Sequence, residues 1–291
     1  MTGEAKRGPT SAGCGLIACA GPSLLVSWGP KASALCQDCL GMEPNSSASQ
    51  PVAEVRHRLY EVYRSTGMGS SPGTGDETPP ASARYLEAVI RPLVPTSTSA
   101  LIGDLACGGG DLLATLKSSG YTRLAGVDLS TEQVQRCHAR GLTFVIKADV
   151  RDFLIDRVGE FDCLVAMDLF EHLELPQAME LASAAARALR AGGQLIIQTC
   201  NANSPLFGSV RYADVTHVTA YTPQSLRQLL RAADFKSVDV YPIAPVGRSV
   251  VGLIRRATWT LVSALVRFYL LVETGQRGHI ISRNLIAVAT V

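Results

Sequence analysis

The stretch that most constrains the fold runs over residues 100–130 and reads ALIGDLACGGGDLLATLKSSGYTRLAGVDLS. A short apolar run ends near Asp104, a glycine turn follows at 108–110, and leucines then recur at helical spacing. A second apolar run, 124–127, closes on Asp128. Because the strands of such a strand–helix–strand unit end at the same edge of a parallel sheet, both acids are predicted to lie at its ligand-binding edge.

The residue types in this stretch suit one kind of ligand. Glycines let the backbone turn with positive φ and let a ligand approach the main chain without meeting a Cβ atom. A carboxylate can accept both hydroxyls of a ribose. A nicotinamide dinucleotide site would need a third glycine where Leu113 stands, and it would need the helix N-terminus that Asp111 occupies for a pyrophosphate. The pattern favours a ligand with an amino acid group and a ribose but no phosphate, such as S-adenosylmethionine.

Residues 104–110, DLACGGG, resemble the first motif of the class I S-adenosylmethionine-dependent methyltransferases, which reads acid, apolar, Gly-x-Gly-x-Gly. The GVDLS segment at 126–130 strengthens the resemblance, which covers about residues 85–255 and the last strand. It implies an α/β fold with a doubly wound, seven-stranded, mostly parallel Rossmann-like sheet, in the order 3-2-1-4-5-7-6 with the last-formed strand antiparallel. Ala106 replaces the motif's first glycine, and a backbone with φ below zero would tolerate its methyl group.

Apolar runs alternate with helical patterns along the chain, which also indicates a parallel, doubly wound sheet. Pro176 is predicted to begin a helix that Gly192 and Gly193 end, and residues 201–221 are predicted to form a loop. Strands are predicted at 101–105, 124–127, 143–148, 161–167, 195–199, 235–241 and 284–291, and helices at 52–63, 85–90, 112–116, 132–140, 176–190 and 223–233.

The composition, 47% hydrophobic and 18% charged, is typical of a globular chain with a full core. We expect a disordered leader at 1–50, a helix and linker at 51–84, and the methyltransferase domain at 85–291 with a helical insertion at 245–275. The net charge of +2 indicates no nucleic acid partner. No segment has the roughly 20 unbroken apolar residues of a membrane span. Because the cofactor pool is cytosolic, we expect a cytoplasmic protein, with peripheral membrane contact as an option.

The leader carries half of the eight cysteines. A CxxC pair with two cysteines upstream could bind zinc, although the spacing of the upstream pair is longer than usual. A disordered or misassigned leader with Met42 as the start is the alternative. A signal peptide is disfavoured because Gly21 and Pro22 break its apolar core. No metal is predicted in the methyltransferase domain. The four leader cysteines are Cys14, Cys19, Cys36 and Cys39.

The insertion contains the segment 249–272, SVVGLIRRATWTLVSALVRFYLLV, which is apolar on nearly every face. One interpretation is a helix packed on the domain or a dimer contact. The other is a lid over a lipid-linked acceptor, with arginines near phosphate or the membrane surface. The oligomeric state stays open. From Pro245 onward the sequence contains six arginines and a single acidic residue, Glu273. These arginines are Arg248, Arg255, Arg256, Arg267, Arg277 and Arg283.

The resemblance assigns cofactor contacts at the strand ends. In the family an acid at the position of Asp149 accepts from the adenine amino group, and Val150 offers its amide. The alternative is a solvated acid that caps the next turn beside Arg151. Leu129 is expected to pack against the adenine or ribose. The predicted cofactor-binding residues are Asp104, Ala106, Cys107, Gly108, Gly110, Asp128, Leu129, Asp149, Val150 and Asp168.

Two segments carry candidate catalytic residues. Residues 168–173, DLFEHL, resemble the D-x-x-E-H-L of many small methyltransferases, and Asp168 is expected to face the methionine part of the cofactor and the acceptor. His172 is a candidate base, and the alternative is that it caps the following helix together with Glu171. In the loop 211–223, RYADVTHVTAYTP, an acid three residues before a histidine could orient it. The predicted catalytic residues are His217, His172, Asp168 and Asp214.

Three functions are consistent with these residues. The loop pattern R-Y-x-D-x-T-H resembles small bacterial methyltransferases of polysaccharide and glycolipid synthesis, which implies a small or lipid-linked acceptor and methylation of a saccharide hydroxyl. A second option is an O-methyltransferase of a quinone-like or aromatic metabolite. The third is a non-catalytic scaffold that keeps the fold, which the intact acids and glycines of 104–128 disfavour.

Overall fold

The computed structural model describes residues 55, 58–59, 80–247 and 249–291. All of them belong to one compact unit that spans residues 53–291. The leader, with its cysteines and its predicted disorder, lies outside the described residues, as do most of the predicted helix at 52–63 and the linker that follows it.

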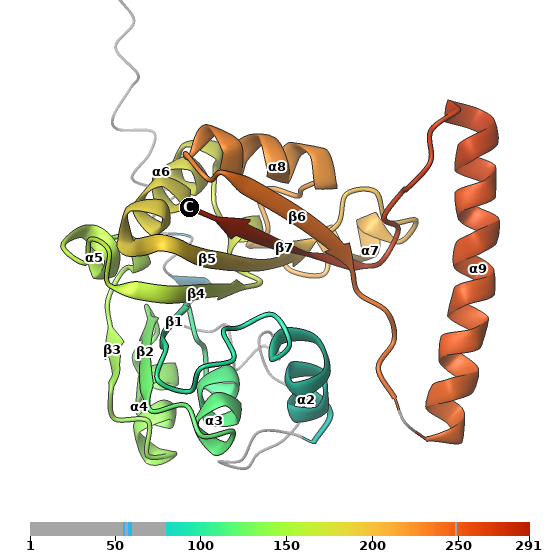
Figure 1. Ribbon diagram of the computed structural model, residues 1–291. Helices are drawn as coiled ribbons and strands as arrows, with labels where there is room; N and C mark the ends of the chain where they lie inside the picture. The colour runs from blue at the N-terminus through green and yellow to red at the C-terminus, as the bar shows by residue number, and fades with distance from the viewer. Residues whose placement is uncertain (1–54, 56–57, 60–79, 248) are drawn as a thin grey trace, which may run out of the picture. The chain divides into compact units, whose positions relative to one another are not determined.

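The described residues form a seven-stranded sheet in the order β3-β2-β1-β4-β5-β7-β6 (Figure 1). Neighbouring strands run parallel, except that β7 is antiparallel to both β5 and β6. The predicted fold class, strand order and antiparallel last strand are therefore confirmed. The strands are β1 Leu101–Leu105, β2 Arg123–Asp128, β3 Val145–Lys147, β4 Phe161–Met167, β5 Leu189–Cys200, β6 Ser237–Pro242 and β7 Asn284–Thr290.

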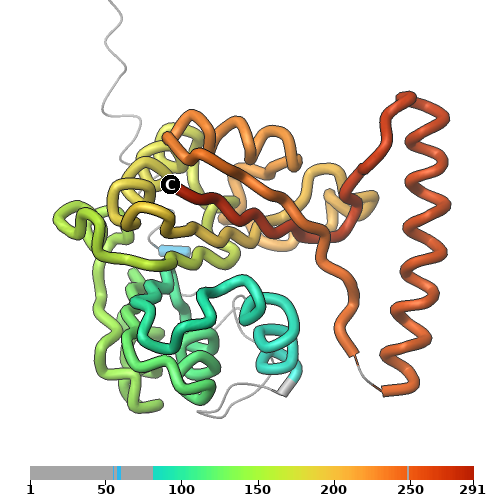
Figure 2. Tube along the Cα trace, viewed as in Figure 1, coloured from blue at the N-terminus to red at the C-terminus, as the bar shows by residue number. Residues whose placement is uncertain are grey.

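Helices cover both faces of the sheet, as the trace in Figure 2 shows. The π-helical turn η1, α3 and α4 pack on one face, where Ile102 and Val165 lie in the core. Helices α5, α6 and α8 pack on the other face, against Leu105 and Leu164. The bounds are α2 Pro80–Tyr85, η1 Leu86–Ile90, α3 Asp111–Ser118, α4 Thr131–Ala139, α5 Val150–Ile155, the 3-10 turn η2 Phe170–His172, α6 Leu175–Ala188, α7 Phe207–Arg211, α8 Pro223–Ala232 and α9 Val250–Thr274.

Strand residues alternate between these two cores because successive side chains point to opposite faces of a sheet. Strand β4 lies at the centre, and all of its residues except the last are buried. The alanine-rich α6 presents small side chains such as Ala178, Ala182 and Ala185 to the larger core, so its backbone can approach the sheet closely. This burial holds the carboxyl ends of β1, β2 and β4 at fixed positions along one edge.

Several boundaries differ from the prediction. Helix α6 ends at Ala188, and β5 begins at Leu189, because Leu189 pairs with Phe161 of β4 before the glycine pair is reached. The third strand is only three residues long. The short helices α5 and α7 appear where the sequence predicts no helix. They occupy the segment after Asp149 and the predicted loop at 201–221.

Helix α9 lies inside the range 245–275 predicted as an insertion. Its N-cap is Ser249, whose side chain accepts a hydrogen bond from the amide of Gly252. It ends at Gly275, which has the left-handed φ of 70° that glycine adopts at a helix C-terminus. Among the residues that the structure describes, no helix is both long enough and apolar enough to span a bilayer.

Candidate active site

The glycine loop between β1 and α3 is held by the acid at the end of β2. Strands β1 and β2 pair in register, so Asp104 and Asp128 lie at the same edge, as predicted. The Asp128 carboxylate accepts hydrogen bonds from the amides of Gly108 and Ser130, both at 2.8 Å. Asp128 therefore fixes the turn that a ligand would approach, in addition to offering its own oxygens.

Both acids carry raised pKa values. Burial raises the pKa of the Asp104 carboxyl well above its ordinary value, with neighbouring Cys137, Asp128 and Asp111 adding to the effect. Burial also raises the pKa of Asp128, although the amides of Ser130 and Gly108 oppose it. A cationic ligand placed here would favour the ionised carboxylates. The two acids therefore suit the positive charge of an amino group or a sulfonium, and they do not suit a phosphate.

The loop conformation corrects one expectation about Ala106. Its φ is +57°, in the left-handed region, so the condition under which its methyl group would be tolerated, a φ below zero, is not met. Gly108 and Gly110 also have positive φ, as expected of glycines in this turn. A Cβ atom built on Gly108 meets nothing within 4 Å, whereas one on Gly110 would lie 2.6 Å from Leu142. Gly108 therefore leaves open space beside the main chain, which a ligand can occupy.

An ion pair between Asp111 and Arg140 occupies the N-terminus of α3. Asp111 and Arg140 lie 2.7 Å apart, and the Arg140 guanidinium also donates to the carbonyl oxygen of Gly109. This acid and its partner block the helix end where a pyrophosphate would bind. This contact agrees with the sequence analysis, which disfavoured a dinucleotide ligand.

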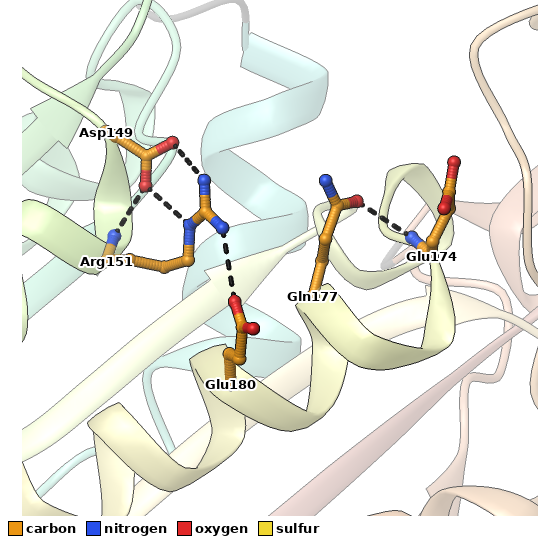
Figure 3. A network of polar contacts seen from close by, with 5 residues as sticks. All are labelled: Asp149, Arg151, Glu174, Gln177 and Glu180. Atoms are coloured by element: carbon orange, nitrogen blue, oxygen red, sulfur yellow. Dashed lines mark hydrogen bonds and ion pairs between the residues drawn. The ribbon is translucent and has the colours of Figure 1, made fainter. Parts of the chain in front are cut away.

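Asp149 shows the contacts of a helix cap (Figure 3). Its side chain accepts from the Arg151 amide at 2.8 Å and pairs with the Arg151 guanidinium at 3.1 Å, and Arg151 also reaches Glu180. These contacts lower the pKa of Asp149. An adenine amino group would have to share this carboxylate with Arg151, so the adenine role stays a prediction. Leu129, at the end of β2, is 52% exposed and accessible to a ligand.

Asp168, at the end of β4, is held by residues of two other elements. The Gln198 amide of β5 donates to both carboxylate oxygens at 2.9 and 3.0 Å, and Tyr85 of α2 donates to the Gln198 side-chain oxygen. Asp168 has a left-handed φ of +51°, a strain typical of functional sites. Asp168 is an exposed residue. Desolvation of its carboxyl nevertheless raises its pKa, and Gln198, His217 and Arg283 oppose this rise.

Glu171 lies inside the protein and does not cap α6. Its carboxylate accepts from the Thr199 hydroxyl at 2.7 Å, and burial, aided by nearby Asp168, raises its pKa to about 8. The cap of α6 is Glu174, whose amide donates to the Gln177 side chain (Figure 3). The capping interpretation of Glu171 and His172 is therefore wrong.

His172 and His217 lie next to each other, with ring centroids 4.7 Å apart. The Thr216 hydroxyl donates to Asp214 at 2.6 Å and contacts Nδ1 of His172 at 2.9 Å. Nδ1 of His217 lies 3.2 Å from the carbonyl oxygen of Val210. Thr216 thus links Asp214 to His172. That Asp214 orients His217 stays a prediction, and the ligand atoms of the three residues lie within 4.8 Å of one another.

The contact with the Val210 carbonyl indicates which ring nitrogen of His217 carries the hydrogen. A carbonyl oxygen only accepts, so Nδ1 of His217 carries the hydrogen, and Nε2 of the neutral ring keeps its lone pair. His172, Asp214 and His217 also each offer one metal-ligating atom, and these atoms lie within 4.8 Å of one another. The group can thus serve as a proton acceptor, and its ligand types also suit a divalent ion, for which the sequence predicts no site here.

Sequence reasoning missed the residues that hold these groups in place. Gln198 and Thr199 are polar residues inside the apolar strand run 195–199, and this interruption was a usable signal. Thr216 stands between the acid and the histidine of the loop motif. Tyr85 precedes the first strand by 16 residues, and nothing in the sequence connects it with β5.

The methyltransferase domain family matches residues 83–240 of the chain. Among curated proteins, the chain is 31% identical over 109 residues to a ubiquinone biosynthesis O-methyltransferase of Xanthomonas oryzae, a match that covers 36% of this chain and 44% of that protein. It is 32% identical over 113 residues to the protein of that name from Xylella fastidiosa, with 37% and 44% covered. The chain spans less than half the length of these relatives.

Solved structures share the fold. A SAM-dependent methyltransferase from Archaeoglobus fulgidus superposes with a TM-score of 0.54 at 20% identity, which covers 72% of this chain and 94% of that one. An S-adenosylmethionine-dependent methyltransferase from Mesorhizobium loti gives a TM-score of 0.51 at 17% identity, with 72% and 98% covered. Since the family match spans more than half of the chain and agrees with its fold and glycine motif, the chain belongs to the class I S-adenosylmethionine-dependent methyltransferases.

Proposed function

We propose that this chain transfers the methyl group of S-adenosylmethionine to a hydroxyl of a small or lipid-linked acceptor, with a saccharide as the preferred class. S-adenosylmethionine supplies a methyl group already activated by a positively charged sulfur. As the bond from this carbon to the acceptor oxygen forms, the bond to sulfur breaks, and the hydroxyl proton leaves to a base. The protein must therefore align the partners, exclude water and accept one proton.

The cofactor residues divide the ligand between the ends of β1 and β2. Asp104 and the open side of Gly108 suit the amino acid part and the sulfur, since they combine a buried acid with free approach to the main chain. Asp128 is proposed to accept the ribose hydroxyls and Leu129 to pack on the adenine. These roles use the acids and glycines that the family match covers.

The proton acceptor is proposed to be Nε2 of His217. A sugar hydroxyl is a weak acid and a poor nucleophile, so the transfer depends on a base in place. The Val210 carbonyl supports the tautomer that leaves Nε2 available. His217 lies close enough to Asp168 to lower the pKa of that carboxyl, and Asp168 is fixed by Gln198. Asp168 can therefore position the acceptor hydroxyl and favour the protonated imidazole that forms.

The observation that carries this proposal is the pair of neighbouring histidines, of which His217 lies near Asp168, at the sheet edge that also holds Asp104 and Asp128. Replacing His217 by alanine is expected to abolish turnover while calorimetry shows unchanged cofactor binding. Unchanged turnover would remove His217 from the mechanism. We assign no metal to this cluster, so dialysis against a chelator is expected to leave turnover intact.

A second candidate function is methylation of a quinone-like or aromatic hydroxyl. It is favoured by the relatives, which are named ubiquinone biosynthesis O-methyltransferases. Few aromatic residues are available to bind such an acceptor: Tyr221 is buried and Tyr212 is exposed, while Trp259 lines a pocket beside Tyr85. Parallel assays with a saccharide hydroxyl and a catechol-like hydroxyl distinguish the two acceptors.

We propose a cytoplasmic location because the cofactor is made and used there.

A further inference from the structure

Helix α9 carries an apolar stripe that faces away from the protein. Six large apolar side chains recur at spacings of three, four and seven residues, which places them on one side of the helix. They are between 61% and 73% exposed, an unusual exposure for a contiguous set of this size. We call this set the outer stripe, and it comprises Val250, Ile254, Leu261, Leu265, Phe268 and Val272.

The opposite side of α9 faces the protein. Gly252 and Ser263 are buried, and Trp259, Val266 and Leu270 are half-buried, at positions that helical geometry places away from the outer stripe. Trp259 lines a pocket together with Tyr85 and Arg283. The side of α9 that carries Trp259 therefore faces the domain, and the outer stripe lies on the opposite side.

Arginines lie on the other sides of α9, away from the outer stripe. Arg255, Arg256 and Arg267 are exposed, and Glu273 is the only acidic residue of the helix. A helix with a solvent-facing apolar stripe and basic residues on its other sides is typical of segments that lie in the plane of a membrane interface. Anionic lipid headgroups would pair with the arginines while the apolar side chains enter the acyl boundary.

We propose that the outer stripe of α9 docks on the surface of an anionic lipid bilayer. Charge complementarity favours a bilayer over a second copy of the chain. If two copies paired through their outer stripes, two helices that each carry three arginines and a single acid would lie side by side and repel each other. An anionic membrane surface meets the same arginines with opposite charge.

This orientation also connects the membrane with the active site. The pocket under α9 is lined by Arg255 and Trp259 on the helix side and by Tyr85 and Arg283 on the domain side. Tyr85 contacts Gln198, which holds Asp168, and Arg283 lies near enough to lower the pKa of Asp168. A lipid-linked acceptor could therefore stay anchored in the bilayer while its polar head reaches Asp168, a consequence that rests on the proposed function.

The test is co-sedimentation of the full chain with vesicles, in the absence of cofactor and acceptor. Binding is expected to vesicles of phosphatidylcholine that contain phosphatidylglycerol, and to weaken as salt is raised. The triple variant Leu261→Gln, Leu265→Gln, Phe268→Gln is expected to lower the partition coefficient by about tenfold or more, since three apolar side chains no longer enter the acyl boundary. The variant Arg256→Gln, Arg267→Gln is expected to weaken the preference for phosphatidylglycerol.

The matched control is Ile155→Gln, Val158→Gln, which removes equally exposed apolar side chains at and after the end of α5. This control is expected to bind vesicles as the unchanged chain does, and circular dichroism checks that each variant is folded. Absence of binding to phosphatidylglycerol vesicles, or equal losses in the triple variant and the control, would overturn the proposal. A dimer in solution that the triple variant dissociates would assign the stripe to a second copy and overturn it too. Because the assay omits methyl transfer, its failure leaves the proposed function standing.

Discussion

At the scale of single residues, the site concentrates unusual backbone and charge states. Ala106 and Asp168 both adopt left-handed φ values, and both lie at the ends of parallel strands. Glu171 and Asp104 are buried acids with raised pKa values. Such conformations and charges cost stability and persist where the surrounding fold holds them in place. They mark the edge of the sheet where the cofactor and acceptor are expected to meet.

The left-handed backbone at Ala106 predicts that glycine is more stable there. The Ala106→Gly variant should raise the free energy of unfolding by about 0.5–1 kcal/mol, since relief of about 1–2 kcal/mol of strain exceeds the added freedom of glycine in the unfolded chain. Urea denaturation measures the difference. As a control, Ala257→Gly in the exposed interior of α9 should lower it by about 1 kcal/mol. Equal destabilisation by both changes would contradict the strained conformation of Ala106.

The raised pKa of Glu171 predicts a pH-dependent stability. The folded carboxyl, with a pKa of about 8, binds its proton more tightly than the unfolded one, whose ordinary pKa is 4.5. This contribution is therefore complete below the unfolded pKa and is lost as pH rises toward about 8. Between pH 5 and 8, Glu171→Gln is expected to lose less stability than the unchanged chain, by at most about 1.4 kcal/mol per pH unit. Parallel stability curves for the two proteins would exclude a protonated Glu171.

At the scale of elements, the β1–loop–β2 unit was the most predictable part of the chain. Its apolar runs, glycines and acids are all local signals, so the sequence alone assigns Asp104 and Asp128 to one edge of the sheet. The boundary between α6 and β5 was predicted poorly. The pairing of Leu189 with Phe161 sets where β5 begins, and such a tertiary contact leaves no local pattern in the sequence. Helix α7 was missed for a similar reason, since its five residues are too few to show periodicity.

The candidate site follows the same division. The acids and histidines were found because their types and spacings match known motifs. The connections between them were not, because Thr216 joins Asp214 to His172 and Gln198 joins Tyr85 to Asp168 across long stretches of chain. Such contacts depend on which elements the sheet order brings together. A sequence shows which groups are present, and the fold determines which of them touch.

The role of β5 in holding Asp168 gives a prediction at this scale. In the Gln198→Leu variant, Asp168 loses the amide that lowers its pKa, so the acidic limb of the pH–rate profile should move to higher pH. Turnover should fall by about tenfold or more, with little change in cofactor affinity. Gln194→Leu on the same strand is the matched control, since Gln194 contacts the Leu93 carbonyl away from the acids. An unshifted pH profile in Gln198→Leu would show that Gln198 supports only the fold.

At the scale of the whole molecule, cofactor binding and folding are linked. The residues proposed to hold the cofactor come from β1, β2 and the loops after them, and their geometry exists only when the sheet is formed. A ligand that binds the folded chain alone must therefore stabilise the whole cooperative unit. A scaffold that merely kept the fold would show no such effect. Stability measured with and without S-adenosylmethionine therefore separates the two possibilities without knowledge of the acceptor.

At a concentration about a hundredfold above its dissociation constant, S-adenosylmethionine should raise the free energy of unfolding by about 2.7 kcal/mol. The Asp128→Asn variant should lose most of this increment at the same concentration, because an amide replaces one of the oxygens that would accept the ribose hydroxyls. Asp239→Asn, at an exposed position of β6, removes the same charge far from the site and should keep the full increment. Thermal unfolding followed by circular dichroism measures all three proteins. If the unchanged chain gains no stability from the ligand, the glycine loop binds no cofactor and the proposed reaction cannot occur there.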